Sequence, residues 1–436
     1  LHRGKLRLSL LLDRKTDETI AFRSGGTVSV ATFVAEATAL AEQLPRHAYV
    51  INLHSDRYRY LRAFCAAVIA GQCTLMPPNR LAHTLSQLAE TYPDSYIIGE
   101  EGDEPPISGV SGAAIPAIDP EQLCAIAFTS GSTGVPKPNN KFWRTLEDGA
   151  RGNARLLLGP DVGELNMVAT VPAQHMWGME MSIMLPLFAP VAISDKTPFF
   201  PQDIVDALNE LPAPVALVSS PIHLETLLRS GVKPRMLDRI FTATAPLSRK
   251  LAANLETTFT TRVQDVFGCS ESGILATRNP ATEDLWNYAD FFELDATQEG
   301  IRIRADHLPE DVLMPDIVEL VGDRQYRWLG RHTDMVNIAG KRGSLADINN
   351  RLRELDGVVD GIVFARDEEP AHLAALVVAP GMDVSDILSQ LKTRIEPVFL
   401  PRPMYKVDML PRQETGKIAI KAVMDMFNQI RASKAN

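Results

Sequence analysis

A chain of 436 residues is too long for one small domain, and at roughly 150 residues per domain it is expected to hold two or three. Its composition, 45% hydrophobic and 22% charged, excludes a disordered or fibrous protein. The net charge of −10 argues against a general nucleic-acid-binding protein. Residues 331–436 carry 15 basic and 14 acidic side chains, against 29 and 40 in residues 1–330, so the acidic excess lies before Arg331.

The cysteines and the apolar runs indicate a cytoplasmic protein. Its four cysteines are widely spaced and form no CxxC pair, which is typical of reduced thiols. No run of 18 apolar residues occurs, so no integral membrane contact is expected. The apolar run Leu8–Leu12 is too short for the core of a signal peptide.

Helix and strand signals alternate along the first third of the chain, which predicts an α/β fold with largely parallel strands. Apolar spacing predicts helices over Val30–Leu44, Asp56–Gly71 and Leu81–Tyr92. Short apolar runs predict strands over Tyr49–Leu53 and Gln72–Met76 and from Tyr96 to Ile98. Residues 101–120 are rich in Gly, Pro, Ser and acidic side chains, as in a surface connection.

The chain continues in this way, with an amphipathic helix over Gln202–Leu211, and changes character near Gly330. After it, helices are predicted over Ile348–Leu355, Val384–Ile395 and Ile420–Ile430, and strands over Val358–Ala365, Leu373–Val378 and Tyr405–Leu410. We therefore expect a large N-terminal domain of mixed and parallel sheets with flanking helices (residues 1–330) and a small α+β domain (331–436).

The most informative motif is a loop after the apolar strand Leu123–Phe128. It reads Thr129-Ser130-Gly131-Ser132-Thr133-Gly134-Val135-Pro136-Lys137. Glycines and hydroxyl side chains offer backbone N–H groups and hydroxyl donors with little bulk, which suits phosphate oxygens. A flexible Ser/Gly linker is the alternative. The P-loop of NTPases is excluded, because no Gly-Lys in the chain is followed by Ser or Thr.

This loop resembles the phosphate-loop signature of the adenylate-forming superfamily of acyl- and aryl-CoA ligases, peptide-synthetase adenylation domains and luciferases. Five further motifs follow in the family's order, so that the resemblance covers residues 123–421. It implies an N-terminal domain that binds ATP and an acid, a mobile C-terminal domain, and ATP and Mg²⁺ as cofactors.

Three motifs resemble the family's nucleotide contacts. The family has a Gly-Gly-Ala-Pro-Leu segment beside adenine and substrate, and the matching segment here is Thr242-Ala243-Thr244-Ala245-Pro246-Leu247. Ala243 and Thr244 take the places of the two glycines, and their larger side chains are expected to narrow the acyl pocket. In Phe267-Gly268-Cys269-Ser270-Glu271, the resemblance assigns Phe267 to adenine, Ser270 to phosphate and Glu271 to Mg²⁺, with Asp265 beside the adenine amino group. Asp316 and Arg331, 15 residues apart, match the pair that binds ribose hydroxyls and phosphate, although each alone reads as a solvated charge.

Two C-terminal motifs resemble the moving parts of the family. Gly340-Lys341-Arg342 matches the turn that lines the thiol tunnel, after a hinge within Gly330–Asp334 whose usual Asp or Lys aligns with Thr333. Lys417 matches the catalytic lysine that reaches the carboxylate and the α-phosphate. It lies in the motif Leu410-Pro411-Arg412-Gln413-Glu414-Thr415-Gly416-Lys417-Ile418.

On the substrate side, His175 in Pro172–Glu180 matches the residue that borders the carboxylate site. Amino-acid-activating relatives keep an Asp here, but none occurs between Pro172 and Ser194, and Glu180 is assigned to the following helix. An unpaired buried ammonium would be unfavourable, so a plain carboxylic acid is expected. The expected pocket walls are His175, Trp177, Ser219, Ser220, Pro221, Thr242, Ala243 and Gly268.

The chain looks most like the short aryl-polyene and xanthomonadin-type ligases that load a hydroxybenzoate onto an acyl carrier protein. The alternative is an acyl- or aryl-CoA ligase that uses coenzyme A as the acceptor. Outside the enzymes, the alternative function is a non-catalytic nucleotide-binding module. An acidic carrier would be repelled by the N-terminal domain, so Lys341, Arg342, Arg402, Lys406 and Arg412 are expected to form its docking face.

Overall fold

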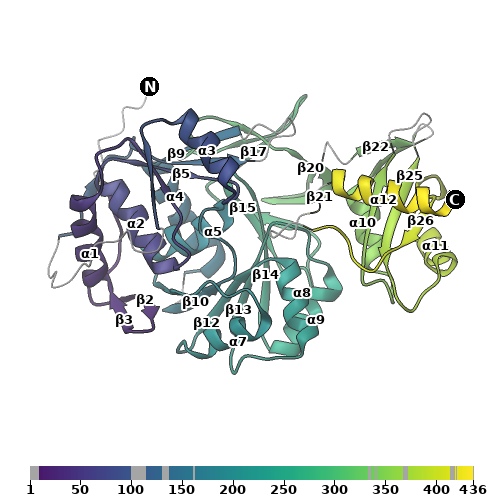
Figure 1. Ribbon diagram of the computed structural model, residues 1–436, viewed down its shortest axis with the longest axis horizontal. Coiled ribbons are helices and arrows are strands. Elements are labelled where there is room, and N and C mark those ends of the chain that lie inside the picture. Colours follow the sequence, from purple (N-terminus) through teal and green to yellow (C-terminus); the bar gives the residue numbers. More distant parts are fainter. Residues whose placement is uncertain are drawn as a thin grey trace.

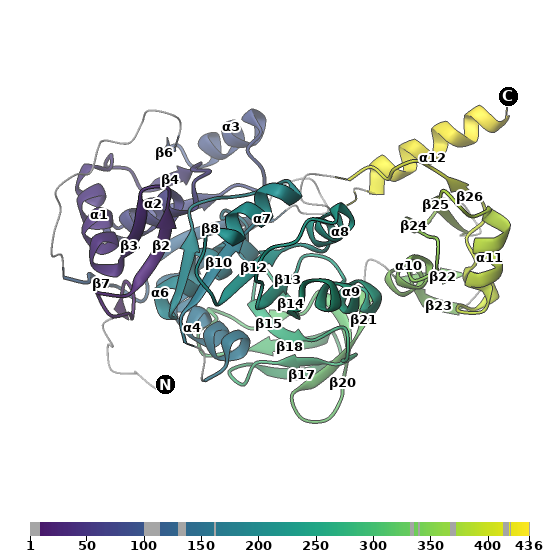
Figure 2. The same ribbon diagram turned by 90° about the horizontal axis from the view of Figure 1, so that it is seen from below.

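The computed structural model describes residues 9–99, 114–129, 137–160, 163–331, 335–338, 341–366, 372–412, 418 and 420–435. Figures 1 and 2 both show a large body that ends with β21 (Gln325–Arg331) and a smaller part that carries the chain from β22 (Met335–Ile338) onward. The α/β fold class expected from the sequence is confirmed. Within the described ranges, no helix is both long and apolar enough to cross a membrane.

The largest sheet of the body has 11 strands in the order β20-β21-β16-β15-β14-β13-β12-β10-β11-β2-β3. Its centre, from β2 to β14, is parallel, whereas β3 at one edge and the strands from β15 outward at the other pair antiparallel. The strands are β2 (Thr19–Arg23), β3 (Gly26–Ser29), β10 (Leu165–Ala169), β11 (Val191–Ser194), β12 (Val215–Ser219), β13 (Arg239–Thr242), β14 (Arg262–Cys269), β15 (Gly273–Arg278), β16 (Trp286–Tyr288) and β20 (Asp316–Leu320).

Helices cover both faces of this sheet. One apolar cluster joins α7 (Pro201–Asn209), α8 (Pro221–Ser230) and α9 (Arg249–Phe259) to the central strands. Another joins α5 (Met176–Met179) and the π-helix η2 (Glu180–Met184) to the opposite side of the same strands. The parallel strands are therefore buried on both faces, as their uninterrupted apolar sequences require.

A second sheet has five strands in the order β6-β4-β5-β8-β9. They are β4 (Tyr49–Asn52), β5 (Cys73–Met76), β6 (Ser95–Ile98), β8 (Leu123–Thr129) and β9 (Lys137–Phe142). The helices near it are α1 (Val30–Gln43), α2 (Arg57–Ile69), α3 (Ala82–Thr91), α4 (Trp143–Asn153) and α6 (Leu185–Phe188), and the π-helix η1 (Ala154–Leu158) follows α4. A large cluster contains residues of α1, α2, β8, α4 and η2, so the body is packed as one unit around both sheets.

Small sheets complete the body: β1 (Ser9–Leu10) with β7 (Ala117–Ile118), and β17 (Glu293–Thr297), β18 (Gly300–Arg304) and β19 (Val312–Leu313). The four cysteines are free.

The smaller part is built on β24 (Asp360–Ala365), β25 (Leu373–Val378) and β26 (Met404–Lys406), beside the hairpin of β22 and β23 (Lys341–Ser344). One apolar cluster joins this sheet to α10 (Leu345–Arg353), α11 (Val384–Lys392) and the short η4 (Pro397–Phe399), and another joins it to α12 (Ile420–Ala435). The two clusters contain only residues from 336 onward, and the clusters of the body stop at Trp328. The division at residue 330 stays a prediction and falls within β21.

Candidate functional site

Three of the polar residues singled out in the sequence form a row across the centre of the large sheet. Ser219 pairs with Thr242, and Thr242 pairs with Asp265, on the adjacent parallel strands β12, β13 and β14. Ser219 and Thr242 end their strands, and all three side chains are buried. Ligands of open α/β sheets bind beyond the carboxyl ends of the strands, so this edge of the sheet is the candidate site.

Two hydroxyls at this edge have no hydrogen-bond partner in the described structure. They are Ser220 Oγ, in a residue that is 5% exposed, and Thr242 Oγ1, in a residue that is fully buried. Trp177 is fixed nearby, because its indole Nε1 donates to the Ser219 carbonyl at 3.2 Å. Buried hydroxyls are nearly always satisfied in proteins, so these two are available to a bound ligand or to water.

Thr244, which the resemblance aligns with a glycine, has a backbone conformation that favours glycine. Its φ is +80°, in a region where a β-branched residue is strained. Thr244 and the next residue, Ala245, are both exposed, whereas Ala243 is buried. Thr244 therefore forms a left-handed turn with its side chain on an exposed face.

His175 is the N-cap residue of the short helix α5 and is partly exposed. The loop before it is held by the buried Arg57, whose guanidinium donates to the carbonyls of Ala169 at 2.9 Å and Val171 at 2.8 Å. Gly178 packs so tightly under this loop that a Cβ would lie 2.0 Å from the Pro172 carbonyl oxygen. The position of His175 is thus set by the buried Arg57 guanidinium and by a close backbone contact at Gly178 that only glycine allows.

The segment Phe267–Glu271 runs over the end of β14. The Phe267 ring lies 5.5 Å from Trp286 and 5.8 Å from Tyr326 between ring centroids, in tilted and edge-on contacts. Gly268 is exposed at a bulge where a Cβ would lie 2.3 Å from the Gly273 carbonyl oxygen. Ser270 and Glu271 are both partly exposed. The Phe267 ring therefore has a fixed wall of aromatic side chains behind it.

The Glu271 carboxylate makes no ion pair with any residue that the structure describes. A free carboxylate oxygen is the kind of ligand that Mg²⁺ takes together with nucleotide phosphates. Within the described ranges no group of three or more His, Cys, Asp and Glu side chains gathers to hold a metal ion. The residues present therefore fit a magnesium ion held by Glu271 and by the phosphates it would accompany.

Asp265 is buried against Arg278, with Oδ2 accepting from Nη2 at 3.2 Å and from Nε at 3.3 Å. Burial raises the pKa of its carboxyl to about 7, although the Arg278 charge opposes this. Arg278 in turn lies 4.4 Å above the Trp286 ring. In this structure the carboxylate proposed for the adenine amino group is thus engaged by an arginine.

Asp316 and Arg331, the proposed ribose pair, lie directly opposite each other on the antiparallel strands β20 and β21. Asp316 is 4% exposed, and its Oδ1 accepts from Trp328 Nε1 at 2.9 Å. The strand pairing brings together two residues that are 15 positions apart in the sequence.

Several predicted residues lie outside the described structure: Ser130, Gly131, Ser132, Thr133, Gly134, Gly340, Lys417 and the hinge positions Thr333 and Asp334. The side chains of Thr129, Arg331 and Arg342 are likewise not described. Lys137 is exposed at the start of β9.

Most of the proposed basic docking face is engaged in contacts of its own. Arg412 forms a two-pronged ion pair with Asp360, Lys341 pairs with Glu396, and Lys406 Nζ donates to the Met382 carbonyl at 2.7 Å. Arg402 is exposed.

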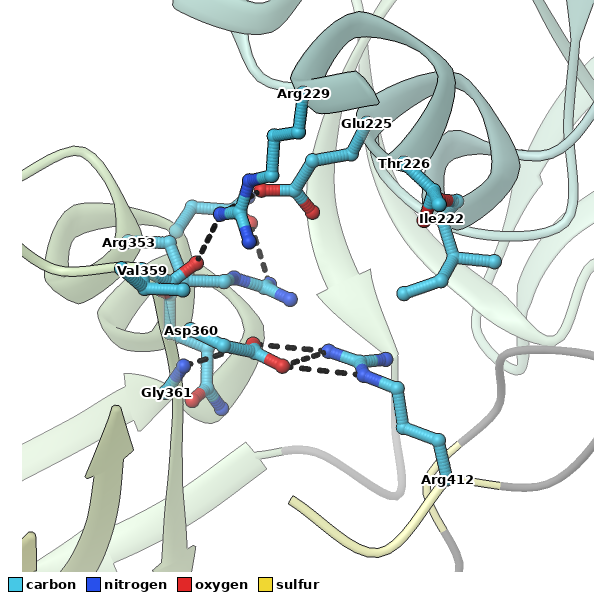
Figure 3. Close-up of polar contacts among 11 residues, drawn as sticks. Ile222, Glu225, Thr226, Arg229, Arg353, Val359, Asp360, Gly361 and Arg412 are labelled. Carbon is cyan, nitrogen blue, oxygen red and sulfur yellow. Dashed lines mark hydrogen bonds and ion pairs between the residues drawn. The ribbon is translucent and has the colours of Figure 1, made fainter. Parts of the chain in front are cut away.

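Contacts also link the two parts of the molecule. Arg229 on α8 donates to the Val359 carbonyl at 3.3 Å, and Lys250 on α9 pairs with Asp356. Figure 3 shows Glu225 and Arg229 of α8 facing Arg353 and the Asp360–Arg412 pair. Since α8 begins directly after Ser220, one short helix connects the candidate site to the smaller part.

The sequence did not point to Asn153 and His307, which line a small cavity behind Glu271 together with Lys141 and Glu180. Glu180 lies in a helix as expected, but its carboxylate also faces this cavity. The four residues belong to separate segments, and no motif joins them.

Comparison with known proteins gives one family and two kinds of relative. The family model described as AMP-binding enzyme matches residues 63–290, more than half of the chain. The 3,4-dihydroxybenzoate–[aryl-carrier protein] ligase of Bacillus anthracis is 24% identical over 339 residues, which cover 74% of this chain and 78% of that protein. The 4-coumarate–CoA ligase of Halorhodospira halophila is 25% identical over 316 residues, 66% of this chain and 73% of that protein.

Among solved structures, the crystal structure of ATP-bound MatB from Rhodopseudomonas palustris has a TM-score of 0.82 and covers 96% of this chain and 98% of its own. It is 18% identical in sequence, so this likeness concerns the fold.

Proposed function

Because the chain belongs to the family of AMP-binding enzymes, we propose that it is an AMP-forming acid–thiol ligase. In this proposal it activates an aryl acid such as a hydroxybenzoate with ATP and passes the acyl group to the phosphopantetheine thiol of an acyl carrier protein. The observation that carries the proposal is the polar row of Ser219, Thr242 and Asp265 at the carboxyl ends of parallel strands, with the unpaired Glu271 carboxylate beyond it.

In the first step, one oxygen of the acid's carboxylate attacks the α-phosphorus of ATP. A P–O bond forms to the acid, the bond to the β-phosphate breaks, and pyrophosphate leaves. Residues 129–137 would surround the phosphates, and Lys417 would neutralise charge on the α-phosphate and the carboxylate. Mg²⁺, held by Glu271, would offset the remaining negative charge of the phosphates.

In the second step, the acceptor's sulfur attacks the carbonyl carbon of the acyl-adenylate. The C–O bond to AMP breaks, a thioester forms, and the thiol proton passes to solvent. We propose that residues 331–436 rotate about Gly330–Asp334 between the steps, so that Lys417 leaves and the Gly340-Lys341-Arg342 turn enters.

The acceptor is the point on which the relatives differ, since one is named as a carrier-protein ligase and another as a CoA ligase. An acyl-CoA or aryl-CoA ligase is therefore the second candidate. The charge distribution favours a carrier protein as the acceptor. Residues 331–436 are near neutral, whereas residues 1–330 carry the acidic excess that would repel an acidic carrier.

The decisive assay is acid-dependent exchange of labelled pyrophosphate into ATP, with a panel of benzoates and fatty acids. Exchange with an aryl acid, followed by thioester formation on carrier protein in preference to coenzyme A, supports the proposal. Nucleotide binding without exchange for any acid would instead indicate a non-catalytic module.

A further inference from the structure

A small cavity lies directly behind the Glu271 motif. Its volume is about 20 Å³, which is room for about one water molecule. Its polar walls are Lys141, Thr145, Asn153, Glu180, Ser272 and His307, and its apolar walls include Met176, Ile274 and Phe291. The wall is largely apolar, and its few polar groups suit a single hydroxyl or water oxygen.

The contacts around the cavity leave both acceptors and donors available. Glu180 Oε1 accepts from the Ile274 backbone N–H at 2.9 Å and from Asn153 Nδ2 at 3.2 Å. No described group donates to Glu180 Oε2. Since the Asn153 amide presents Nδ2 to the carboxylate, its Oδ1 points elsewhere, and this buried oxygen has no hydrogen-bond partner among the described residues.

The donor is Lys141. Its side chain is 3% exposed, and its ammonium makes one hydrogen bond within the described structure, to the Glu271 carbonyl at 3.1 Å. An ammonium carries three N–H donors, so two remain for a ligand. Lys141 and Glu180 do not form an ion pair within 4 Å, although each influences the other: burial lowers the pKa of Lys141 and raises that of Glu180, and their mutual attraction opposes both shifts.

The charges decide which polar group the cavity accepts. A second carboxylate on the acid would meet Glu180 and the Asn153 Oδ1, both of which repel it. An ammonium would meet Lys141. A hydroxyl on the acid accepts from Lys141 and donates to Glu180 or to Asn153, so it matches both kinds of wall, as a water molecule would in its place.

The cavity lies beside two of the segments proposed to form the acid site. Ser272 and Ile274 follow Glu271, Met176 follows His175, and Lys141 holds the Glu271 carbonyl. Gly273 has φ +76°, and a Cβ on it would lie 2.6 Å from Glu180 Oε1, so a larger residue would displace the carboxylate. The cavity is thus bounded by the segment of His175, proposed to border the acid's carboxylate, and by the segment of Glu271, proposed to lie beside the phosphates.

We propose that Lys141, Asn153 and Glu180 bind a hydroxyl on the end of the acid opposite its carboxylate, and that they select hydroxylated acids over the parent acids. The inference rests on the proposed function and adds the residues that set substrate choice. These residues act on specificity and do not take part in the chemical step.

The test compares kcat/KM for pyrophosphate exchange with benzoate and with its 2-, 3- and 4-hydroxy derivatives, using the full chain. The wild type should prefer one hydroxybenzoate over benzoate on the order of 10²-fold, the range of one or two charge-assisted hydrogen bonds. Asn153→Leu and the nearly isosteric Glu180→Gln should each bring this ratio at least tenfold closer to one. Asn166→Leu is the matched control, because Asn166 is an equally buried asparagine on β10 that bonds to Pro212 instead, and it should leave the ratio unchanged.

Equal kcat/KM for benzoate and all its hydroxy derivatives would overturn the inference and leave the proposed function standing. So would a preference that survives both Asn153→Leu and Glu180→Gln. The Glu180 variant changes no volume, so it provides the answer if the Asn153 variant does not fold. Absence of exchange with every acid would overturn the proposed function, and this inference with it.

Discussion

Asp316 lies directly opposite Arg331 in the antiparallel pairing of β20 with β21. Residues paired in this way have Cβ atoms about 5 Å apart, so the hairpin brings these two positions side by side. The Trp328 indole bonds to Asp316 Oδ1 and fixes the carboxylate in place. That the two residues share one polar ligand, the ribose, stays a prediction.

Asp316→Asn should raise the KM for ATP by about tenfold, because an amide accepts fewer hydrogen bonds from two ribose hydroxyls than a carboxylate does. The amide oxygen can still accept from Trp328, so thermal stability should change little. Steady-state pyrophosphate exchange measures the effect. Glu319→Gln, on the same strand but exposed and paired with Arg327, serves as the control. An unchanged KM for ATP in the Asp316 variant would remove it from the nucleotide site.

Lys417→Ala should reduce adenylation by on the order of 10²-fold or more, as for the loss of a preorganised charge contact. It should spare thioester formation from a supplied acyl-adenylate, since Lys417 is proposed to leave the site before the second step. Lys421→Ala, an exposed lysine on α12, should affect neither half-reaction. Equal losses in both half-reactions of the Lys417 variant would contradict its assigned role.

Arg402→Glu should weaken loading of a carrier protein several-fold at low salt, because Arg402 is an exposed member of the proposed docking face. The effect should fade as salt rises, and transfer to coenzyme A should be unaffected. Lys392→Glu, an exposed lysine at the end of α11, tests whether any charge reversal on this part has the same result. Loading that does not respond to salt or to Arg402→Glu would place the carrier elsewhere.

His307 should make stability fall in acid. Burial lowers its pKa from 6.5 to about 4, so between these values the unfolded chain binds a proton that the folded chain does not. The free energy of unfolding should therefore rise with pH from about 4 to about 6.5 and then level off, with a contribution on the order of 3 kcal/mol from this residue.

His307→Gln should remove that part of the slope in urea unfolding measured at a series of pH values. His83→Gln, in an exposed position on α3, should leave the slope as it is. A slope that persists unchanged in the His307 variant would assign the acid sensitivity to other groups.

The sequence predicted the regular elements well where one face is apolar over several turns. The helix expected over Val30–Leu44 is α1 (Val30–Gln43), and the strand expected over Leu373–Val378 is β25. The strand expected over Tyr405–Leu410 was wrong in its extent, because β26 is Met404–Lys406 and its last contact with β25 is the Val407 N–H to the Val377 carbonyl. Strand length depends on the neighbouring strand, which local apolar patterning does not report.

The candidate site was predictable only where residues fall within one motif. The row of Ser219, Thr242 and Asp265 follows from motifs at the ends of successive strands. The left-handed turn at Thr244 could not be read from a threonine, since that residue type avoids it. Lys141 and Glu180 stand 39 positions apart and meet only through packing, so their shared cavity left no signal in the sequence.

Acid-dependent pyrophosphate exchange shows whether this chain activates a carboxylic acid as an adenylate. A hydroxybenzoate should drive exchange of labelled pyrophosphate into ATP, omission of the acid should abolish the exchange, and Glu271→Gln should reduce it by on the order of 10²-fold. ATP binding with no exchange for any acid in the panel would show that the chain is not an adenylate-forming enzyme.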